Sequence, residues 1–228
     1  MLPRGLIVSC QAYEGDPLFG PHIMAAMACA AQQGGAVAIR ANGPADIAAI
    51  RAAVSLPIIG LWKIGPTGLH DVYITPDAPA TESIAAAGCS IIAIDATPRK
   101  RAGEIDLRSL IDYIHDNLHL PVMADISCLN DALQAVELGA DVVSTTLAGY
   151  TAHGRPPMEE PDLPLLGAVL SRVRVPVVAE GRFATPAQVA AAFDLGAHAV
   201  VVGAAITRPE QITARFVRAY VTRIHSGP

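Results

Sequence analysis

Residues 194–203, DLGAHAVVVG, contain the pattern that decides the fold. The end of a helix is followed by glycine, a small residue and a run of β-branched residues. Glycine suits the left-handed stop of a helix, and a continuous valine or isoleucine run is typical of a buried parallel strand. The same order occurs in QQGGAVAIR (32–40), AAGCSIIAID (86–95) and ELGADVVSTT (137–146). The chain therefore repeats one helix-to-strand unit.

A second pattern begins strands with proline, where no needed hydrogen-bond donor is lost. It occurs in LPIIGLWK (56–63), LPVMADI (120–126) and VPVVAEG (175–181). Together with LIVSC, the two patterns predict eight strands, near residues 6–10, 36–40, 57–62, 90–95, 121–126, 141–147, 176–180 and 199–204. The segments between them predict helices, for example over 21–33, 44–54, 81–87, 107–118, 130–138 and 186–195.

Eightfold alternation of strand and helix predicts an α/β protein, a single-domain (β/α)8 barrel over residues 1–228. An open doubly wound sheet is the alternative. It would need a glycine-rich dinucleotide fingerprint after the first strand, and SCQAYEGD is not one. The only long polar loop, residues 153–162, follows the sixth predicted strand and is placed to cover the barrel mouth.

Composition excludes several classes of partner. The chain of 228 residues is 52% hydrophobic, which is enough for a large core. Its net charge is −5 and its longest basic run is RKR (99–101), whereas nucleic-acid binding needs a clustered basic face. The apolar runs GLIVSC and 23–31 are too short for a signal peptide or a membrane span, so we expect a soluble, cytoplasmic protein.

Metal or disulfide chemistry is not indicated by the cysteines and histidines. The four cysteines (Cys10, Cys29, Cys89, Cys128) are scattered without a C-x-x-C pair, which favours reduced, buried thiols. None of the seven histidines ends a predicted strand, although Asp95 and Asp125 do. A metal-dependent epimerase would be expected to place histidines beside these aspartates. We therefore expect no metal and no cofactor.

Each predicted strand ends in one residue that faces the barrel mouth, where barrel enzymes place their chemistry. These residues are Gln11, Arg40, Lys63, Asp95, Asp125, Thr145 or Thr146, Glu180 and Gly203. A charge at this position must meet water, a ligand or a partner, because burying it alone is prohibitive. A ring of structural salt bridges is the alternative interpretation, but it does not require so many polar strand ends.

Lys63 and Glu180 end the third and seventh predicted strands, so they are expected to face each other across the mouth. Two acid–base groups on opposite sides of a substrate suit removal of a proton from one face and its return to the other. Lysine acts as a base only if desolvation or a nearby cation, such as Arg40 or Arg182, favours its neutral form. Gln11, Arg40 or Asp125 could help to stabilise the carbanion. A Schiff base on Lys63 is the alternative use of this residue.

The ends of the seventh and eighth strands suit an anion. Barrels often bind phosphate there through backbone N–H groups and the N-terminus of a short helix. Gly181, Gly203 and Ala204 permit close approach of the backbone, and Arg182 and Arg208 can pair with phosphate oxygens.

Taken together, these residues resemble a known family, the bacterial N-acylglucosamine-6-phosphate 2-epimerases, also called N-acetylmannosamine-6-phosphate 2-epimerases. The motifs that carry the resemblance span nearly the whole chain in the family's order: SCQA, AIRANG, LPIIGLWK, VYITP, IIAIDAT, MADIS, TTLAGYT, PVVAEGR and VVVGAAITRP. The resemblance implies a (β/α)8 barrel without metal or organic cofactor that acts in sialic acid and amino-sugar catabolism. It also implies that the protein forms a homodimer.

By this resemblance, Lys63 and Glu180 are the catalytic pair at C2 of an N-acyl amino-sugar 6-phosphate. The resemblance also implies sugar contacts from Gln11, Arg40 and Asp125, and a phosphate site built from Gly181, Arg182, Gly203, Ala204 and Arg208. The chain departs from the family at Ala204, often serine, and at Cys128 and Ala148, which occupy the T of DIST and the S of LSGYT. None of these changes removes the acid–base pair.

Two other functions stay open at this point. One is another phosphosugar isomerase, or a lyase that forms a Schiff base on Lys63. The other is a sugar-phosphate sensor without turnover, which would have no need for opposed acid–base groups.

Overall fold

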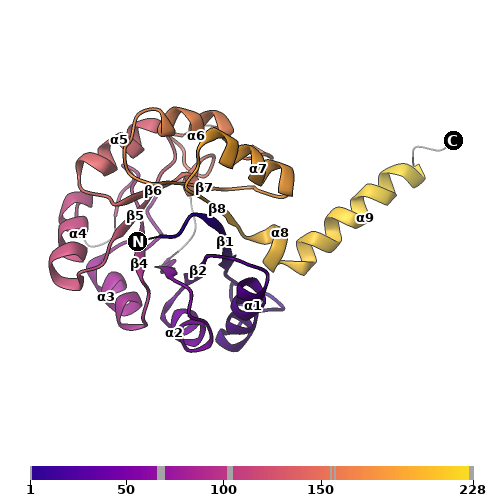
Figure 1. Cartoon of the computed structure of the whole chain (residues 1–228), viewed down its shortest axis with the longest axis horizontal. Helices are drawn as coiled ribbons and strands as arrows, with labels where there is room; N and C mark the ends of the chain where they lie inside the picture. Colours follow the sequence, from indigo (N-terminus) through magenta and orange to yellow (C-terminus); the bar gives the residue numbers. More distant parts are fainter. Residues whose placement is uncertain (1, 66–69, 102–104, 155, 157, 226–228) are drawn as a thin grey trace.

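The computed structural model describes residues 2–65, 70–101, 105–154, 156 and 158–225. Within them, eight parallel strands form a closed barrel in chain order, and β8 pairs with β1 (Figure 1). The strands are β1 (Gly5–Cys10), β2 (Ala38–Asn42), β3 (Ile58–Leu61), β4 (Ile91–Asp95), β5 (Val122–Asp125), β6 (Val142–Ser144), β7 (Val177–Glu180) and β8 (Ala199–Val202). The predicted (β/α)8 barrel is confirmed.

Helices follow the strands around the outside of the barrel (Figure 1). They are α1 (Pro21–Gln33), α2 (Pro44–Ala53), α3 (Ala78–Ala86), α4 (Leu107–Tyr113), α5 (Leu129–Glu137), α6 (Leu163–Leu170), α7 (Pro186–Leu195), α8 (Ala204–Thr207) and α9 (Pro209–His225). Most predicted boundaries lie within three residues of the observed ones, and two predictions differ in the kind of structure. The strand predicted to residue 147 ends at Ser144 because Thr145–Leu147 form a 3-10 turn, and the helix predicted to residue 118 changes to a π-helix over Ile114–Leu118.

Helix starts carry local signals that fix where each strand ends. Asp77, Asp106 and Asp162 accept a hydrogen bond from a backbone N–H in the first turn of α3, α4 and α6. At α7, Thr185 and Gln188 form a reciprocal capping box ahead of Pro186. These caps satisfy N–H groups that a helix would otherwise leave without partners, and they fix where each of the four helices begins.

Every second residue of each strand points into the barrel and helps to fill it. These residues include Ile7, Ala38, Ile59, Ala93, Met123, Val178 and Val201, all buried in one cluster. Two further clusters lie between the strands and the surrounding helices. The parity predicted from the sequence is therefore correct, and it aims the next inward residue of each strand at the mouth.

The last helix, α9, does not cover the barrel but projects away from it (Figure 1). No helix in the described part of the chain combines the length and the apolar composition that spanning a bilayer requires.

Candidate active site

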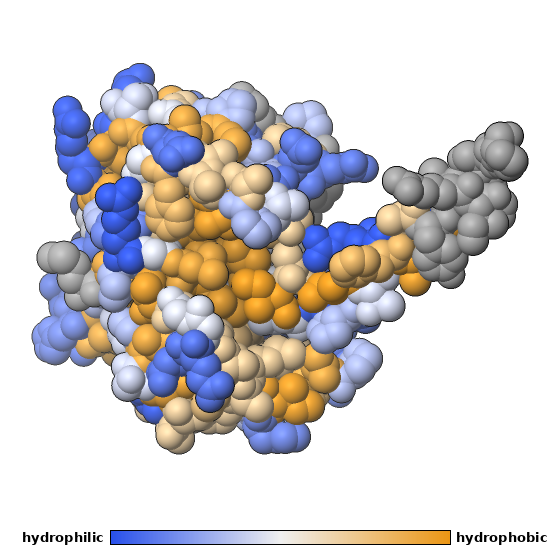
Figure 2. Space-filling model, turned by 45° about the vertical axis from the view of Figure 1, so that its right-hand side comes forward, coloured by the Kyte–Doolittle hydropathy of each residue, from blue (hydrophilic) through white to orange (hydrophobic). Residues whose placement is uncertain are grey.

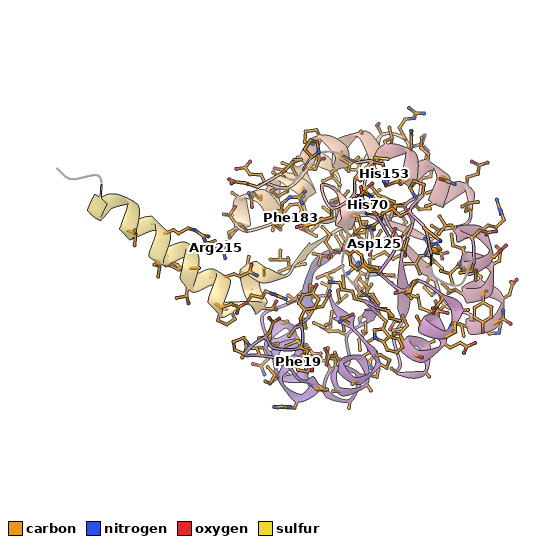
Figure 3. All side chains as sticks on the ribbon, turned by 180° about the vertical axis from the view of Figure 1, so that it is seen from behind. Phe19, His70, Asp125, His153, Phe183 and Arg215 are labelled. Carbon is orange, nitrogen blue, oxygen red and sulfur yellow. The ribbon has the colours of Figure 1, made fainter. Side chains whose placement is uncertain are left out.

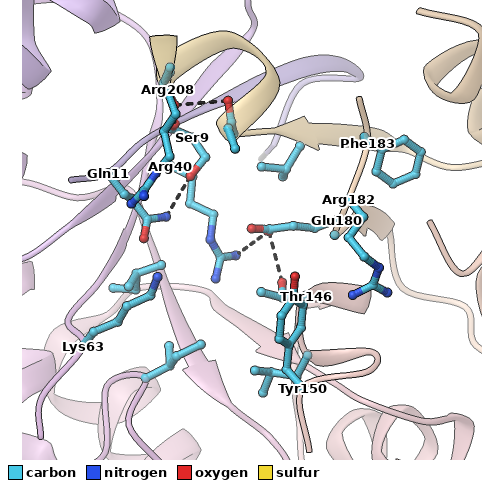
Figure 4. Close-up of a pocket in the computed structure, with 18 of the residues that line it drawn as sticks. Ser9, Gln11, Arg40, Lys63, Thr146, Tyr150, Glu180, Arg182, Phe183 and Arg208 are labelled. Carbon is cyan, nitrogen blue, oxygen red and sulfur yellow. Dashed lines mark hydrogen bonds and ion pairs between the residues drawn. The ribbon is translucent and has the colours of Figure 1, made fainter. Parts of the chain in front are cut away.

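A cavity of about 340 Å³ opens at the carboxyl ends of the strands (Figure 4). Its volume lies within the range of small-molecule sites, about 300–1,000 Å³. It is lined by nine of the ten predicted site residues: Gln11, Arg40, Lys63, Glu180, Gly181, Arg182, Gly203, Ala204 and Arg208. The tenth, Asp125, is fully buried and lies near the barrel centre below the cavity (Figure 3).

Arg40 lies at the floor of the cavity and joins two carboxylates. Its Nη1 and Nη2 donate to the two oxygens of Asp125 over 3.1 and 2.5 Å, a bidentate pair. Its Nη1 also lies 3.1 Å from Oε2 of Glu180. Asp125 therefore fixes the plane of the guanidinium, which leaves Arg40 able to present charge to the cavity without rotating.

Two adjacent threonines of the 3-10 turn after β6 hold Glu180 in different ways. The Thr146 hydroxyl bridges Oδ1 of Asp125 at 2.8 Å and Oε2 of Glu180 at 3.1 Å. The Thr145 hydroxyl instead bonds the backbone N–H and C=O of Glu180. Side chain and backbone of Glu180 are thus both positioned by the turn.

Burial raises the pKa of Glu180 above its ordinary value. The positive charge of Arg40 acts in the opposite direction, and the charge of Asp125 adds to the effect of burial. The side chain still has 14% of its surface exposed, towards the cavity. Glu180 can therefore hold a proton at a pH where an exposed glutamate is ionised, and it can deliver that proton to a bound molecule.

Lys63 follows β3 and enters the cavity from the side opposite Glu180 (Figure 4). Its backbone N–H donates to Oδ1 of Asn42 at 2.9 Å, which fixes the start of the side chain. Its ammonium group donates to the hydroxyl of Tyr13 at 2.8 Å. The predicted opposition of Lys63 and Glu180 over one cavity is present in the structure.

Unpaired polar atoms face the same space. The Gln11 amide donates from Nε2 to the Ser9 hydroxyl at 2.8 Å, whereas its Oε1 is buried without a hydrogen-bond partner. Nε of Arg40 is also buried without one. Since buried polar groups are nearly always hydrogen-bonded, these atoms at a cavity wall are natural contacts for a ligand.

The backbone after β7 turns sharply. Gly181 has φ 110° and Arg182 has φ 61°, so two successive residues adopt left-handed conformations. The Arg182 guanidinium donates to the carbonyls of Ala148 and Glu160 and lies 5.1 Å from the ring centre of Tyr150. Arg182 is therefore largely engaged with the protein, and its buried Nη2 is the donor without a partner.

The remaining part of the cavity wall is formed by the end of β8 and by α8. Gly203 precedes α8, whose first N–H groups have no partner within the helix. Arg208 follows α8 and pairs with Asp16 at 3.2 Å, while its guanidinium lies 5.2 Å from the ring centre of Tyr13. Arg208 and the start of α8 thus bring positive potential to the side of the cavity that includes Gly181 and Gly203.

Comparison with known proteins places the chain in a family. Residues 24–222 match the family model described as "Putative N-acetylmannosamine-6-phosphate epimerase". The chain belongs to this family. The resemblance found in the sequence motifs is therefore confirmed.

Family relatives match along almost their whole length. A "Putative N-acetylmannosamine-6-phosphate 2-epimerase" of Caldanaerobacter subterraneus subsp. tengcongensis is 48% identical over 227 residues, which cover 99% of this chain and 95% of the relative. The protein of the same description from Clostridioides difficile is 48% identical over 94% of this chain and 95% of its own.

A solved structure of the family has the same fold. It belongs to the N-acetylmannosamine-6-phosphate 2-epimerase from Clostridium perfringens, with a TM-score of 0.90 and 45% identity, and the match covers 94% of this chain and 92% of that one. A thiamine phosphate pyrophosphorylase from Pyrococcus furiosus matches with a TM-score of 0.57 and 15% identity, which shows a shared barrel fold alone.

Sequence reasoning missed several side chains of the cavity, among them the polar side chains of Tyr13, Tyr73 and Thr207. Tyr73 lies in the quoted motif VYITP, between the predicted strands at 57–62 and 90–95, where no strand parity marks which way a side chain points. Tyr13 lies three residues beyond a predicted strand and Thr207 lies in an unpredicted helix, so no periodicity marks which way either side chain points. Tyr150 also lines the cavity.

One group of side chains outside the cavity has donor atoms suited to a metal. Among the described residues, Cys128, Asp131 and His153 place a sulfur, an oxygen and a nitrogen within 4.8 Å of one another. The Asp131 carboxylate already accepts from the N–H groups of Ser127 and Cys128 at the start of α5, and from the Ser127 hydroxyl. These bonds account for the cluster as a helix cap that joins the loops after β5 and β6. Of the four free cysteines, Cys10 and Cys89 are buried as predicted, whereas Cys29 and Cys128 are partly exposed.

Proposed function

We propose that this chain inverts C2 of N-acetylmannosamine 6-phosphate to give N-acetylglucosamine 6-phosphate, and catalyses the reverse reaction. The single observation that carries the proposal is the opposition of Lys63 and Glu180 across one cavity, with Arg40 between them. Membership of the epimerase family supplies the substrate. Binding alone would not need an amine and a raised-pKa carboxyl group on opposite faces of the ligand.

The chemistry requires the open-chain form of the sugar, because the C2 proton is acidic only beside the C1 aldehyde. In the proposal, the neutral Lys63 amine takes the C2 proton and the electron pair moves to the aldehyde oxygen as an enolate. Protonated Glu180 then delivers its proton to the opposite face of C2. The reverse reaction exchanges the two roles, and proton exchange with solvent restores both groups.

Arg40 is proposed to stabilise the charge that develops on the enolate. Its guanidinium is held in place by Asp125, so it needs no rearrangement during the reaction. Gln11 is proposed to accept a hydrogen bond from the sugar through its unpaired Oε1. Because Asp125 is fully buried, we now propose that it serves the sugar through Arg40 and Thr146.

The phosphate is proposed to lie against Gly181, Arg182, Gly203, Ala204 and Arg208. The start of α8 supplies backbone N–H groups, and Ala204 donates through its backbone without a side-chain hydroxyl. Arg208 now pairs with Asp16, so phosphate would compete with that carboxylate. The proposal uses no metal and no cofactor.

The direct test is proton NMR of the purified protein with N-acetylmannosamine 6-phosphate in deuterated water. We expect N-acetylglucosamine 6-phosphate whose C2 carries deuterium from the first turnover, because Glu180 exchanges its proton with solvent. Absence of the new sugar signals would overturn the proposed function. Product that retains the original hydrogen at C2 would exclude separate donor and acceptor residues.

We propose in addition that residues 1–228 form one barrel domain with a projecting arm, α9, and that two copies of the chain associate through this arm. Phe216 and Val217 of α9 are 75% and 41% exposed, and a groove of about 470 Å³ separates α9 from the barrel flank near Phe183. Figure 2 shows hydrophobic side chains running from that flank onto α9, and Figure 3 shows Arg215 beside the same opening. Such a continuous apolar patch on a surface is typical of a protein interface.

Light scattering coupled to size exclusion tests this association. We expect the wild type to have the mass of two chains, Phe216→Glu that of one, and Leu195→Glu, at an apolar position on α7 that is 47% exposed, that of two. A wild type with the mass of one chain would refute the homodimer. The cytoplasmic location expected from the sequence stays a prediction.

A further inference from the structure

Tyr13 is a residue of the cavity that neither the motifs nor the family name assigns a task. It lies in the loop after β1, three positions beyond its last residue, and it lines the same cavity as Lys63 and Arg208. We infer that Tyr13 is a positioning residue that holds the amine of Lys63 in place for proton transfer at C2. This inference rests on the proposed function and adds a component to it.

The contact is made through the hydroxyl group. Nζ of Lys63 lies 2.8 Å from the Tyr13 hydroxyl oxygen but 5.1 Å from the ring centre. These two distances place the amine beside the hydroxyl end of the ring, not over its face. A hydrogen bond therefore orients the amine, and removal of one oxygen atom should abolish that orientation.

The loop that carries Tyr13 is itself fixed. The Tyr13 N–H donates to Oδ2 of Asp16 at 2.8 Å, and the Asp16 N–H donates back to the Tyr13 carbonyl at 2.9 Å. The same carboxylate pairs with Arg208, whose guanidinium lies 5.2 Å from the Tyr13 ring centre. The ring is thus held from the β8 side of the mouth while its hydroxyl holds Lys63 on the β3 side.

A hydroxyl partner suits a lysine that must alternate between its charged and neutral forms. A tyrosine hydroxyl both donates and accepts, so it can accept from the ammonium and donate to the neutral amine. A carboxylate in the same place would favour the ammonium and hinder its use as a base. Lysine also has a flexible four-carbon side chain, and a displacement of about 1 Å at a reacting group can cost about a hundredfold in rate.

The chain offers an unusually clean test, because Lys63 and Lys100 are its only lysines. Reductive methylation with carbon-13 formaldehyde converts each into a dimethylamine that keeps one N–H when protonated. Two lysine signals result, and Lys100→Arg assigns them. Lys100 is exposed and serves as the reference for a solvated side chain.

We expect the Lys63 signal of the wild type to lie apart from that of Lys100, and Tyr13→Phe to remove at least half of this separation. Tyr113→Phe, which alters an exposed tyrosine bonded to Glu82, should leave it unchanged. In unmethylated protein, Tyr13→Phe should lower kcat about tenfold, the fold-change expected for loss of one hydrogen bond to a charged group, and leave KM within twofold. Tyr13→Ala should raise KM as well, because the ring beside Arg208 is lost.

The outcomes separate this inference from the proposed function. An unchanged Lys63 signal in Tyr13→Phe overturns the contact, and a shifted signal with wild-type kcat overturns the role in positioning. If the wild type does not convert the sugar phosphate, the proposed function fails, while the methylated sample still decides whether Tyr13 holds Lys63.

Discussion

Two groups of charged side chains stand at the ends of the barrel strands, and one of them borders the cavity at the barrel mouth whereas the other does not. After β4, Asp95 pairs with Arg99 and accepts from the Thr97 hydroxyl, and all three residues are buried. At the ends of β2, β5 and β7, Arg40 joins Asp125 and Glu180, and Glu180 borders the cavity. The first group is a closed salt bridge and the second is a candidate catalytic centre.

The difference comes from the residues that follow each carboxylate. In DATPR, the arginine four residues after Asp95 folds back over it and forms an ion pair with it. In EGR, Gly181 and Arg182 take left-handed conformations, and the arginine turns away to the carbonyls of Ala148 and Glu160. A charge at a strand end thus indicates a site only when the next residues leave it uncovered.

The largest expected effect is a loss of turnover when either proposed acid–base residue of the cavity is changed. Lys63→Ala and Glu180→Gln should each lower kcat by roughly 10²–10⁴, the usual contribution of a general acid or base. Thermal unfolding should stay close to that of the wild type, because both side chains border the cavity. Initial-rate assays with N-acetylmannosamine 6-phosphate measure this, with Lys100→Ala as the matched control. Turnover within tenfold of wild type in both variants would remove the basis for the assignment.

A change in the Asp95–Arg99 ion pair should instead lower the stability of the fold. Asp95→Asn removes the carboxylate that pairs with the buried guanidinium of Arg99, and breaking one side of a buried pair typically costs about 3–5 kcal/mol in free energy of unfolding. Denaturant unfolding at pH 7.5 measures the change. The double variant Asp95→Leu, Arg99→Met, which removes both charges, should recover most of the loss. If the single variant is as stable as the wild type, this pair is not the structural element that we describe.

The comparison also shows what the sequence could predict. All eight strands follow from local apolar runs, glycine stops and leading prolines. Strand parity explains why Gln11, Arg40, Lys63 and Glu180 line one cavity, whereas the other predicted residues that line it lie at or beyond the ends of β7 and β8. The closure of Asp95 by Arg99 was missed, since it depends on the path of a loop. Helix α9 was not among the predicted helices, although Ile212, Phe216, Val217 and Val221 recur at helical spacing, because no strand follows it to complete the repeated unit.

The adjacent residues Thr145 and Thr146 permit the same comparison between an effect on turnover and an effect on stability. Thr146→Val removes hydrogen bonds to the side chains of Asp125 and Glu180, so kcat should fall about tenfold to a hundredfold, with unfolding little changed. Thr145→Val removes bonds to the backbone of Glu180 and should cost about 1–3 kcal/mol in stability. Parallel rate and unfolding measurements separate the two effects. Equal losses of stability would mean that both threonines are purely structural.

The smallest expected effect concerns Asp46, a buried carboxylate that belongs to neither group. It lies in the first turn of α2, and burial raises its pKa to about 6 from 3.8. The folded state therefore binds the proton more tightly than the unfolded state, and stability is lost as the pH rises from about 4 to above 6. Asp46→Asn should remove this loss and gain about 1–2 kcal/mol at pH 8, since the positive helix N-terminus offsets part of the penalty.

Asp106 provides the control of opposite sign. It caps α4, and the N–H of Ser109 that it binds holds the pKa of this exposed carboxylate below its ordinary value. Its contribution is therefore present above the unfolded pKa and is lost as the pH falls, so Asp106→Asn should be less stable than wild type at pH 8 and approach it in acid. Denaturant unfolding of both variants between pH 4 and pH 8 should give differences from wild type of opposite sign. A stability gain for Asp46→Asn that is the same at every pH would show that relief of buried charge is not its cause.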